Sequence, residues 1–237
     1  MTDHPARSRL AFALDYANLD EARDAARRVR DSVGVLKVGL ELFVREGPAA
    51  IALGSQLGCD VFLDLKLHDI PETVERAVAS AAAHGVRFLT LHAGGGQAML
   101  ARAAERVQGT QLTLLAVTVL TSLDARDLDQ LGVAASPSEH ARRLAQLGWA
   151  AGVKGFVCST QEVAILRREL GSDAFLVTPG IRPAGPAADD QKRTGTPASA
   201  IADGSSLLVV GRPIRDAADP AAAARAIADE IAGAGRA

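Results

Sequence analysis

The chain has 237 residues, of which 48% are hydrophobic, and this is enough material for the core of a single α/β barrel. Aromatic residues make up only 3%, so the core must be built mainly from small aliphatic side chains. The formal net charge is −2 with both signs scattered along the chain, which disfavours nucleic acid and anionic membranes as partners.

Short apolar runs alternate along the chain with longer alanine-rich segments of helical period. The apolar runs predict strands at Leu10–Leu14, Val35–Val38, Asp60–Leu65, Val86–Leu91, Leu112–Val119, Gly155–Cys158, Phe175–Val177 and Leu207–Val210. The segments between them predict helices that include Leu19–Val33, Glu72–His84, Gln97–Val107, Ser138–Ala151, Thr160–Leu170 and Pro220–Ala232.

This alternation of strands and helices indicates the fold class. Strands that are each followed by a helix form a parallel sheet, and continuous Val/Leu/Ile runs indicate a sheet covered on both faces. Eight repeats within 237 residues favour a closed (β/α)8 TIM barrel, with residues 1–237 as a single domain. An open doubly wound sheet stays as the alternative, because periodicity cannot show closure.

Cysteine usage and the absence of long apolar segments predict the compartment. Cys59 and Cys158 lie at the edges of apolar runs without metal-ligand neighbours, and we interpret both as small buried side chains in a reducing compartment. The N-terminal stretch MTDHPARSRL has no apolar signal core, and no run approaches the roughly 20 apolar residues of a membrane span. A soluble, cytoplasmic protein is therefore expected.

Polar residues follow the predicted strands, where the active site of such a barrel lies. They are Asp15, Lys37, Asp64, Lys66, His92, Thr121, Ser122, Arg182 and Arg212. Asp64 and Lys66 are two positions apart on a strand, so both point to one face, while Leu65 points toward the helices. Lys37 reaches the same rim from the neighbouring strand.

Four charged residues, Lys37, Asp64, Lys66 and Asp69, could therefore meet in one small pocket. A structural ion-pair network is the alternative, but buried ion pairs are costly to desolvate, and charges grouped at a barrel mouth are better explained by function. Asp69 precedes Pro71, which suits the first position of a helix. From this turn Asp69 could act in its own pocket, cap the helix or reach a second subunit.

A phosphate site is predicted after the last two strands. Gly211-Arg212-Pro213 follows the eighth strand directly, and an arginine beside the amides of a helix N-terminus binds anions, although the motif alone is also compatible with a structural turn. Residues 178–197 form a long loop rich in Gly and Pro that carries Arg182 and Gln191. Such a loop beside an anion site indicates a lid over a phosphate.

Other motifs are weaker. Gly94-Gly95-Gly96 lacks the last glycine of a dinucleotide motif because residue 99 is Met99, and it indicates a tight turn. His68 and His92 could be acid–base groups, but hydrogen-bonded structural histidines are favoured. No Cys/His cluster in the sequence has zinc spacing.

Several motifs occur in a fixed order along the chain. The main one is Asp64-Leu-Lys66-Leu-His-Asp69-Ile70-Pro71-Glu-Thr73. The others are Ala13-Leu14-Asp15, Leu36-Lys37-Val-Gly, Leu120-Thr121-Ser122, Thr178-Pro-Gly-Ile-Arg182-Pro, Asp190-Gln191-Lys-Arg193 and Val210-Gly211-Arg212-Pro-Ile. Over nearly its whole length the chain thus resembles the orotidine 5′-monophosphate decarboxylase family. Asp189, where a smaller residue is expected, departs from the pattern within the lid.

The resemblance implies removal of CO₂ from C6 of the orotate ring, with uridine 5′-monophosphate as product and neither metal nor organic cofactor. It implies that Lys66 donates the proton and that Asp64 and Lys37 complete the charged array. Asp69, Ile70 and Thr73 would reach the neighbouring site of a homodimer. The remaining implied contacts are Asp15 and Lys37 with the ribose, Thr121 with the pyrimidine, and Gln191, Gly211 and Arg212 with the phosphate, with Arg182 in the closing loop.

Two other functions stay open. A magnesium-dependent sugar-phosphate decarboxylase or aldolase of the same barrel superfamily shares the Asp-x-Lys-x-x-Asp pattern, but it places an acidic metal ligand where this chain has Lys37. A non-catalytic sensor of pyrimidine nucleotides would bind the same ligand, but binding alone has no need of Lys66 between two carboxylates.

Overall fold

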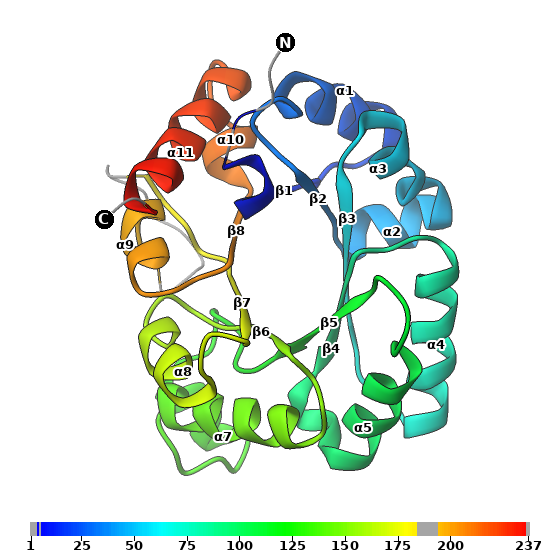
Figure 1. Ribbon diagram of the computed structural model, residues 1–237, viewed down its shortest axis with the longest axis vertical. Coiled ribbons are helices and arrows are strands. Elements are labelled where there is room, and N and C mark those ends of the chain that lie inside the picture. Colours follow the sequence, from blue (N-terminus) through cyan, green and yellow to red (C-terminus); the bar gives the residue numbers. More distant parts are fainter. Residues whose placement is uncertain (1–3, 5, 184–193, 236–237) are drawn as a thin grey trace.

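The structure is a computed structural model that describes residues 4, 6–183 and 194–235, and the parallel strands of these ranges close into an eight-stranded barrel (Figure 1). The strands are β1 (Leu10–Ala13), β2 (Val35–Val38), β3 (Asp60–Leu67), β4 (Phe88–His92), β5 (Thr113–Val117), β6 (Gly155–Val157), β7 (Phe175–Thr178) and β8 (Leu207–Val210). Each strand pairs with the next, and β8 pairs with β1. The predicted single-domain TIM barrel is therefore confirmed, and the open sheet is excluded.

Helices surround the barrel on its outside (Figure 1). They are α1 (Leu19–Val29), α2 (Leu40–Glu46), α3 (Ala52–Leu57), α4 (Pro71–Ala83), α5 (Gly96–Arg106), α6 (Ala125–Gln130), α7 (Pro137–Ala150), α8 (Val163–Leu170), α9 (Pro197–Ala202), α10 (Arg212–Arg215) and α11 (Pro220–Ala234). The six predicted helices are all present with shifted ends. None of the helices in the described ranges has the length and apolar character that crossing a membrane requires.

Two apolar layers hold the strands in place. Inside the barrel a small cluster includes Ala11, Ala13 and Phe62, and outside it a larger cluster joins the strands to the helices. Along β3, Phe62 belongs to the inner cluster, whereas Leu63 and Leu65 contact the outer one. The period of two therefore holds here, and the predicted outward direction of Leu65 is confirmed.

The end of β3 differs from the prediction. This strand continues to Leu67 instead of ending at Leu65, and its register against β4 shifts between Leu63 and Leu67. Within the shift, Lys66 has a φ of 50°, and it is the only non-glycine residue of the described ranges with a positive φ. A β-bulge of this kind turns side chains in a way that simple alternation cannot predict.

The first and last residues of the predicted lid, residues 178–197, belong to regular elements and not to a loop. Thr178 still belongs to β7, and α9 begins at Pro197. Next to these elements, the backbone N–H of Arg182 donates to the carbonyl oxygen of Gly195 at 2.9 Å, so the two ends of the loop lie side by side. Gln191 lies outside the described residues.

The two cysteines differ in burial. Cys158 is 1% exposed, as predicted, and follows β6. Cys59 is only partly buried, so its prediction as a buried side chain was wrong. It lies at the entrance of β3, where its sulfur is 3.5 Å from the carbonyl oxygen of Val33 and 3.6 Å from Nη2 of Arg7.

Candidate active site

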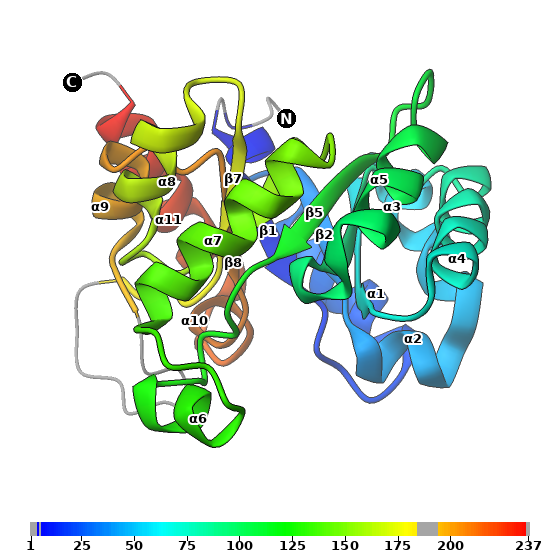
Figure 2. The same ribbon diagram turned by 90° about the horizontal axis from the view of Figure 1, so that it is seen from below.

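A cleft of about 470 Å³ opens at the carboxyl ends of the strands. Its lining comprises Ala13, Asp15, Lys37, Phe62, Asp64, Lys66, Val117, Val119, Leu120, Thr121, Val157, Cys158, Pro179, Gly180, Arg182, Val209, Gly211, Arg212 and Arg215. The loop carrying α6 and the short α10 lie at the same end of the barrel (Figure 2). This is the end at which barrels of this type bind their ligands.

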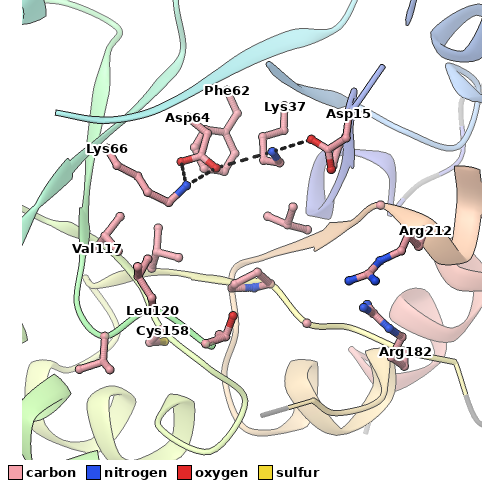
Figure 3. A pocket seen from close by; sticks show the side chains of 18 of the residues that line it. Asp15, Lys37, Phe62, Asp64, Lys66, Val117, Leu120, Cys158, Arg182 and Arg212 are labelled. Carbon is pink, nitrogen blue, oxygen red and sulfur yellow. Dashed lines mark hydrogen bonds and ion pairs between the residues drawn. The ribbon is translucent and has the colours of Figure 1, made fainter. Parts of the chain in front are cut away.

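A row of alternating charges crosses one wall of the cleft (Figure 3). Lys66 Nζ lies 2.9 Å from both carboxylate oxygens of Asp64. Lys37 Nζ lies 3.6 Å from Asp64 Oδ2 and 3.4 Å from Asp15 Oδ1. The sequence prediction that Lys37, Asp64 and Lys66 meet is confirmed, and Asp15 extends the row at its far end.

Neighbouring strands place these side chains together. Lys37 on β2 is in register with Ala13 on β1 and Phe62 on β3, both of which belong to the inner cluster. Asp64 follows Phe62 by two positions, so its side chain lies on the same inward face. Directly after β2, Gly39 allows a close approach, because a Cβ there would lie 3.1 Å from Lys37 Nζ.

The neighbours of Asp64 in the row set the charge of its carboxyl. Burial alone would raise the pKa of its carboxyl, but Lys37 and Lys66 outweigh that effect, and hydrogen bonds from Lys66 and Thr90 add to theirs. The pKa of Asp64 is therefore lower than its ordinary value.

Asp69, Ile70 and Thr73 lie outside this cleft. Asp69 is exposed in the turn between β3 and α4, where its carboxylate accepts a hydrogen bond from the backbone N–H of Ile70 at 2.7 Å. Ile70 is 66% exposed, and Thr73 is exposed in the first turn of α4. Asp69 is not among the described residues that line the cleft of its own chain, and its part in the charged array stays a prediction.

Arginines gather across the cleft from the charged row (Figure 3). Arg182, from the loop after β7, and Arg212, from α10, face each other there. Pro213 stands in the first turn of α10, as the sequence predicted. Gly211 also lines the cleft and lies against Asp15, since a Cβ at this position would be 3.6 Å from Asp15 Oδ2. Thr121 lines the wall after β5 together with Leu120.

Sequence reasoning missed two polar residues of the site. Arg215 lines the cleft, where it forms an ion pair with Asp216 at 2.7 Å and donates to the backbone carbonyl oxygen of Asp15 at 3.4 Å. Its spacing of three from Arg212 was an available signal, because such residues share one helix face. Thr90 on β4 hydrogen-bonds Asp64 and had no signal beyond being polar in an apolar strand.

His68 and His92 form a pair beside the site without lining the cleft. Their ring centroids are 5.4 Å apart, and His68 lies against the tight turn at Gly94 and Gly95. Burial lowers the pKa of His92, and the positive charges of His68 and Lys66 lower it further, although Asp64 acts in the opposite direction.

The order of these residues matches a known protein family. A model of the family described as "Orotidine 5'-phosphate decarboxylase / HUMPS family" matches residues 8–227. The chain belongs to this family. The match spans every strand of the barrel and all described residues of the cleft.

Individual relatives agree over nearly the full length. The chain is 56% identical to an "Orotidine 5'-phosphate decarboxylase" from Anaeromyxobacter sp. (strain K), with 93% of this chain and 96% of that protein covered. It is 51% identical to the protein of the same name from Chromohalobacter salexigens, with 94% and 95% covered. The crystal structure of orotidine 5′-phosphate decarboxylase from Lactobacillus acidophilus superposes with a TM-score of 0.81 at 37% identity, covering 94% of this chain and 98% of the other.

Proposed function

We propose that this cleft decarboxylates orotidine 5′-monophosphate to uridine 5′-monophosphate, with Lys66 as the proton donor. The relatives that share about half of their residues with this chain bear the name of that activity. The observation that supports the role of Lys66 is its ammonium group, held 2.9 Å from both oxygens of a buried carboxylate inside the cleft.

The chemistry requires a fixed positive charge. When the bond between C6 and the carboxylate carbon breaks, CO₂ leaves and its bonding electrons remain on C6 of the ring. A preorganised ammonium stabilises that developing charge and then transfers a proton to C6, forming the new C–H bond. Lys66 is afterwards reprotonated from water. Asp64 holds the ammonium in place through its two contacts of 2.9 Å, and its own negative charge faces the departing carboxylate.

The phosphate would bind at the opposite end of the cleft. Arg212 and the backbone at Gly211 face this end, and Arg182 enters it from the loop after β7. The roles of Gln191 and of a lid over residues 178–197 are part of this proposal. At the described ends of this segment, the backbone N–H of Arg182 donates to the carbonyl oxygen of Gly195 at 2.9 Å, which places Arg182 beside the start of the next helix.

A homodimer would supply the remaining groups, with Asp69, Ile70 and Thr73 acting in the neighbouring site. Large apolar side chains support this arrangement, because Leu40 and Val44 of α2 and Ile70 before α4 are 51%, 81% and 66% exposed. Helices α2 and α4 lie side by side on the barrel (Figures 1 and 2). Apolar surface of this kind is typical of protein interfaces. The predicted cytoplasmic location also stays a prediction.

The position of Lys37 disfavours a magnesium-dependent reaction. Its ammonium stands between Asp15 and Asp64, where it neutralises the two carboxylates that a divalent cation would need. No group of three His, Cys, Asp or Glu side chains in the described ranges could hold a metal ion. A nucleotide sensor is disfavoured for another reason, because ligand binding does not require an ammonium fixed beside the pyrimidine.

An absorbance assay tests the proposal. Orotidine 5′-monophosphate is mixed with the purified protein, and the ultraviolet absorbance is followed with time, with and without a chelator. We expect turnover that the chelator leaves unchanged and that Lys66→Ala abolishes while the circular dichroism stays native. Lys154→Ala serves as the control, because Lys154 is an exposed lysine that packs on Trp149. No absorbance change would favour the sensor, and a loss of activity with chelator would favour the metal enzyme.

A further inference from the structure

Lys66 has a strained backbone conformation that neighbouring residues must hold in place. Between the paired residues Leu63–Leu89 and Leu67–Leu91, β3 contains three residues where β4 contains one. Lys66 lies in this bulge with a φ of 50°. A non-glycine residue with such a positive φ is strained, and it persists only where its surroundings hold it there.

The single residue that faces the bulge from β4 is Thr90. It is 0% exposed, and its hydroxyl oxygen accepts a hydrogen bond from the backbone N–H of Lys66 at 2.9 Å. The same oxygen lies 2.9 Å from Asp64 Oδ1. A hydroxyl group has one proton, and the N–H of Lys66 brings its own, so the threonine proton is donated to the carboxylate.

Thr90 therefore fixes both the backbone and the side-chain ammonium of Lys66. The backbone of Lys66 is held directly, through its N–H. Its ammonium is held indirectly, because Thr90 orients the Asp64 carboxylate, and both oxygens of that carboxylate lie 2.9 Å from Lys66 Nζ. A buried hydroxyl with both partners satisfied in a low-dielectric interior makes a stiff network.

We propose that Thr90 is a positioning residue for the decarboxylation, and that its hydroxyl sets the place of the Lys66 ammonium through Asp64 and through the strained backbone of the bulge. The inference rests on the proposed role of Lys66 as proton donor. Thr90 does not line the cleft, so its removal should affect the rate of the chemical step and leave substrate binding nearly intact.

The test compares Thr90→Val, which replaces the hydroxyl with a methyl group, with Thr90→Ser, which keeps the hydroxyl. For Thr90→Val we expect kcat to fall ~10- to 100-fold, because small displacements of a reacting group have effects of this size. KM should change by less than about threefold. Thr90→Ser should restore most of kcat. If the valine variant does not fold, Thr90→Ala removes the hydroxyl without placing a methyl group against Asp64.

Thr118→Val is the matched control. Thr118 is also a buried threonine, 5% exposed, and its hydroxyl donates to the carbonyl oxygen of Val157 at 2.9 Å, away from Lys66. We expect this variant to lose stability and to keep its kcat. A second readout is the titration of Asp64 by carbon NMR, which should move to higher pH in Thr90→Val and stay in place in Thr118→Val. Asp64 also faces Lys37 on β2, Lys66 on β3 and His92 on β4, and these groups are unchanged in both variants.

The outcomes separate this inference from the proposed function. A wild-type kcat in Thr90→Val, together with an inactive Lys66→Ala, would overturn the positioning role alone. Equal losses in Thr90→Val and Thr90→Ser would also overturn it, since the methyl packing and not the hydroxyl would then matter. Near-normal turnover by Lys66→Ala would instead overturn the proposed function on which the inference rests.

Discussion

Asp64 lies between two ammonium groups, and this arrangement decides its charge. Its side chain is 13% exposed, so desolvation opposes ionisation. Lys37 on one side and Lys66 on the other restore the ionised form, and their effects exceed that of burial. The charge of Asp64 therefore depends on both lysines, and a change in either of them is expected to appear in the titration of this carboxyl.

We predict that Lys37→Met raises the pKa of Asp64, because the largest attraction that opposes burial is removed. The carboxyl has a lowered pKa in the folded protein, so its contribution to stability is present above its ordinary pKa of ~3.9 and is lost as the pH falls through the lowered value. In the variant this loss should be smaller and should end at higher pH, because the folded-state pKa lies closer to the unfolded one. The measurements are carbon NMR of the Asp64 carboxyl and urea unfolding as the pH is lowered.

Lys154→Met is the control for this titration, since Lys154 is exposed before β6 and plays no part in the charged row. Its Asp64 titration should match that of the wild-type protein. An Asp64 titration that is the same in Lys37→Met and in the wild type would show that Lys37 does not set the charge of this carboxyl.

At the scale of single residues, sequence pattern predicted those contacts that depend on one strand. Asp64 and Lys66 share a face because of the period of two, and Lys37 follows from the parallel order of the strands. Thr90 could not be predicted, because its contact depends on a bulge in another strand. For Asp69 the sequence pattern left three possibilities open, because a turn after a strand does not fix the direction of a side chain.

At the scale of elements, the end of the cleft that is lined by Arg182, Arg212 and Arg215 is formed by a loop and a short helix. Helix α10 has four residues and presents Arg212 and Arg215 to the cleft. Such helices escape sequence prediction, since two turns or fewer show no clear period. Helices α2, α3, α6 and α9, which have six or seven residues, were not named from the sequence for the same reason. What could be predicted was the start of α10, because Gly211 and Pro213 mark it directly.

We predict that Arg212→Ala mainly weakens ligands that carry a phosphate. A charge-assisted hydrogen bond contributes about 1.5–3 kcal/mol, so the inhibition constant of uridine 5′-monophosphate should rise roughly 10- to 100-fold. The bare nucleoside uridine should bind as it does to the wild type. Competition assays with both ligands measure this difference.

Arg225→Ala is the control, because Arg225 is an exposed arginine on α11 and does not line the cleft. It should leave both inhibition constants unchanged. An equal loss of affinity for nucleotide and nucleoside in Arg212→Ala would contradict the phosphate role of this arginine.

Two glycines are predicted to respond in opposite ways to the same substitution. Gly155 begins β6, and a Cβ there would lie 2.5 Å from the carbonyl oxygen of Leu114 and 2.6 Å from Leu115 Cδ2. Gly155→Ala should therefore lower the free energy of unfolding by about 1–3 kcal/mol. Gly233 lies within α11 with no atom within 4 Å of the added Cβ, and Gly233→Ala should raise that free energy by up to about 1 kcal/mol.

Urea unfolding at neutral pH measures both variants against the wild type. If Gly155→Ala were as stable as the wild type, strands β5 and β6 would have to move apart more easily than their register indicates. A loss of stability in Gly233→Ala would show that this turn of α11 is not packed as described.

At the scale of the whole molecule, the closed barrel could be predicted because the unit of one strand followed by a helical segment occurs eight times in the chain. Each repeat alone leaves strand and helix boundaries open by a few residues, but the count and the order fix the architecture. The completeness of the active site within one chain is also a property of the whole molecule. In this chain Lys37, Asp64 and Lys66 meet, whereas Asp69 stays outside.

We predict that two inactive variants restore activity when they share a dimer. If Asp69 serves the neighbouring site, a mixed dimer of Lys66→Ala and Asp69→Ala has one site with both lesions and one intact site. Random exchange makes half of the dimers mixed, so about a quarter of the wild-type activity should return. The measurement is the decarboxylation rate after the two variants are unfolded and refolded together.

Mixing Lys66→Ala with Asp64→Ala is the control, because both lesions then affect the cleft of their own chain and no intact site can form. This mixture should stay inactive. If the mixture of Lys66→Ala and Asp69→Ala stays equally inactive, Asp69 does not act across a dimer interface.

The lining of the cleft also affects how a ligand arrives. Among its described residues, Lys37, Lys66, Arg182, Arg212 and Arg215 stand against Asp15 and Asp64, although the whole chain has a net charge of −2. The mouth of the barrel is thus a local source of positive potential on a weakly acidic molecule. Such a field speeds the diffusional encounter with an anion and reaches only about 8 Å at physiological ionic strength. Added salt should therefore slow capture of the substrate more than it slows the reaction of substrate already bound.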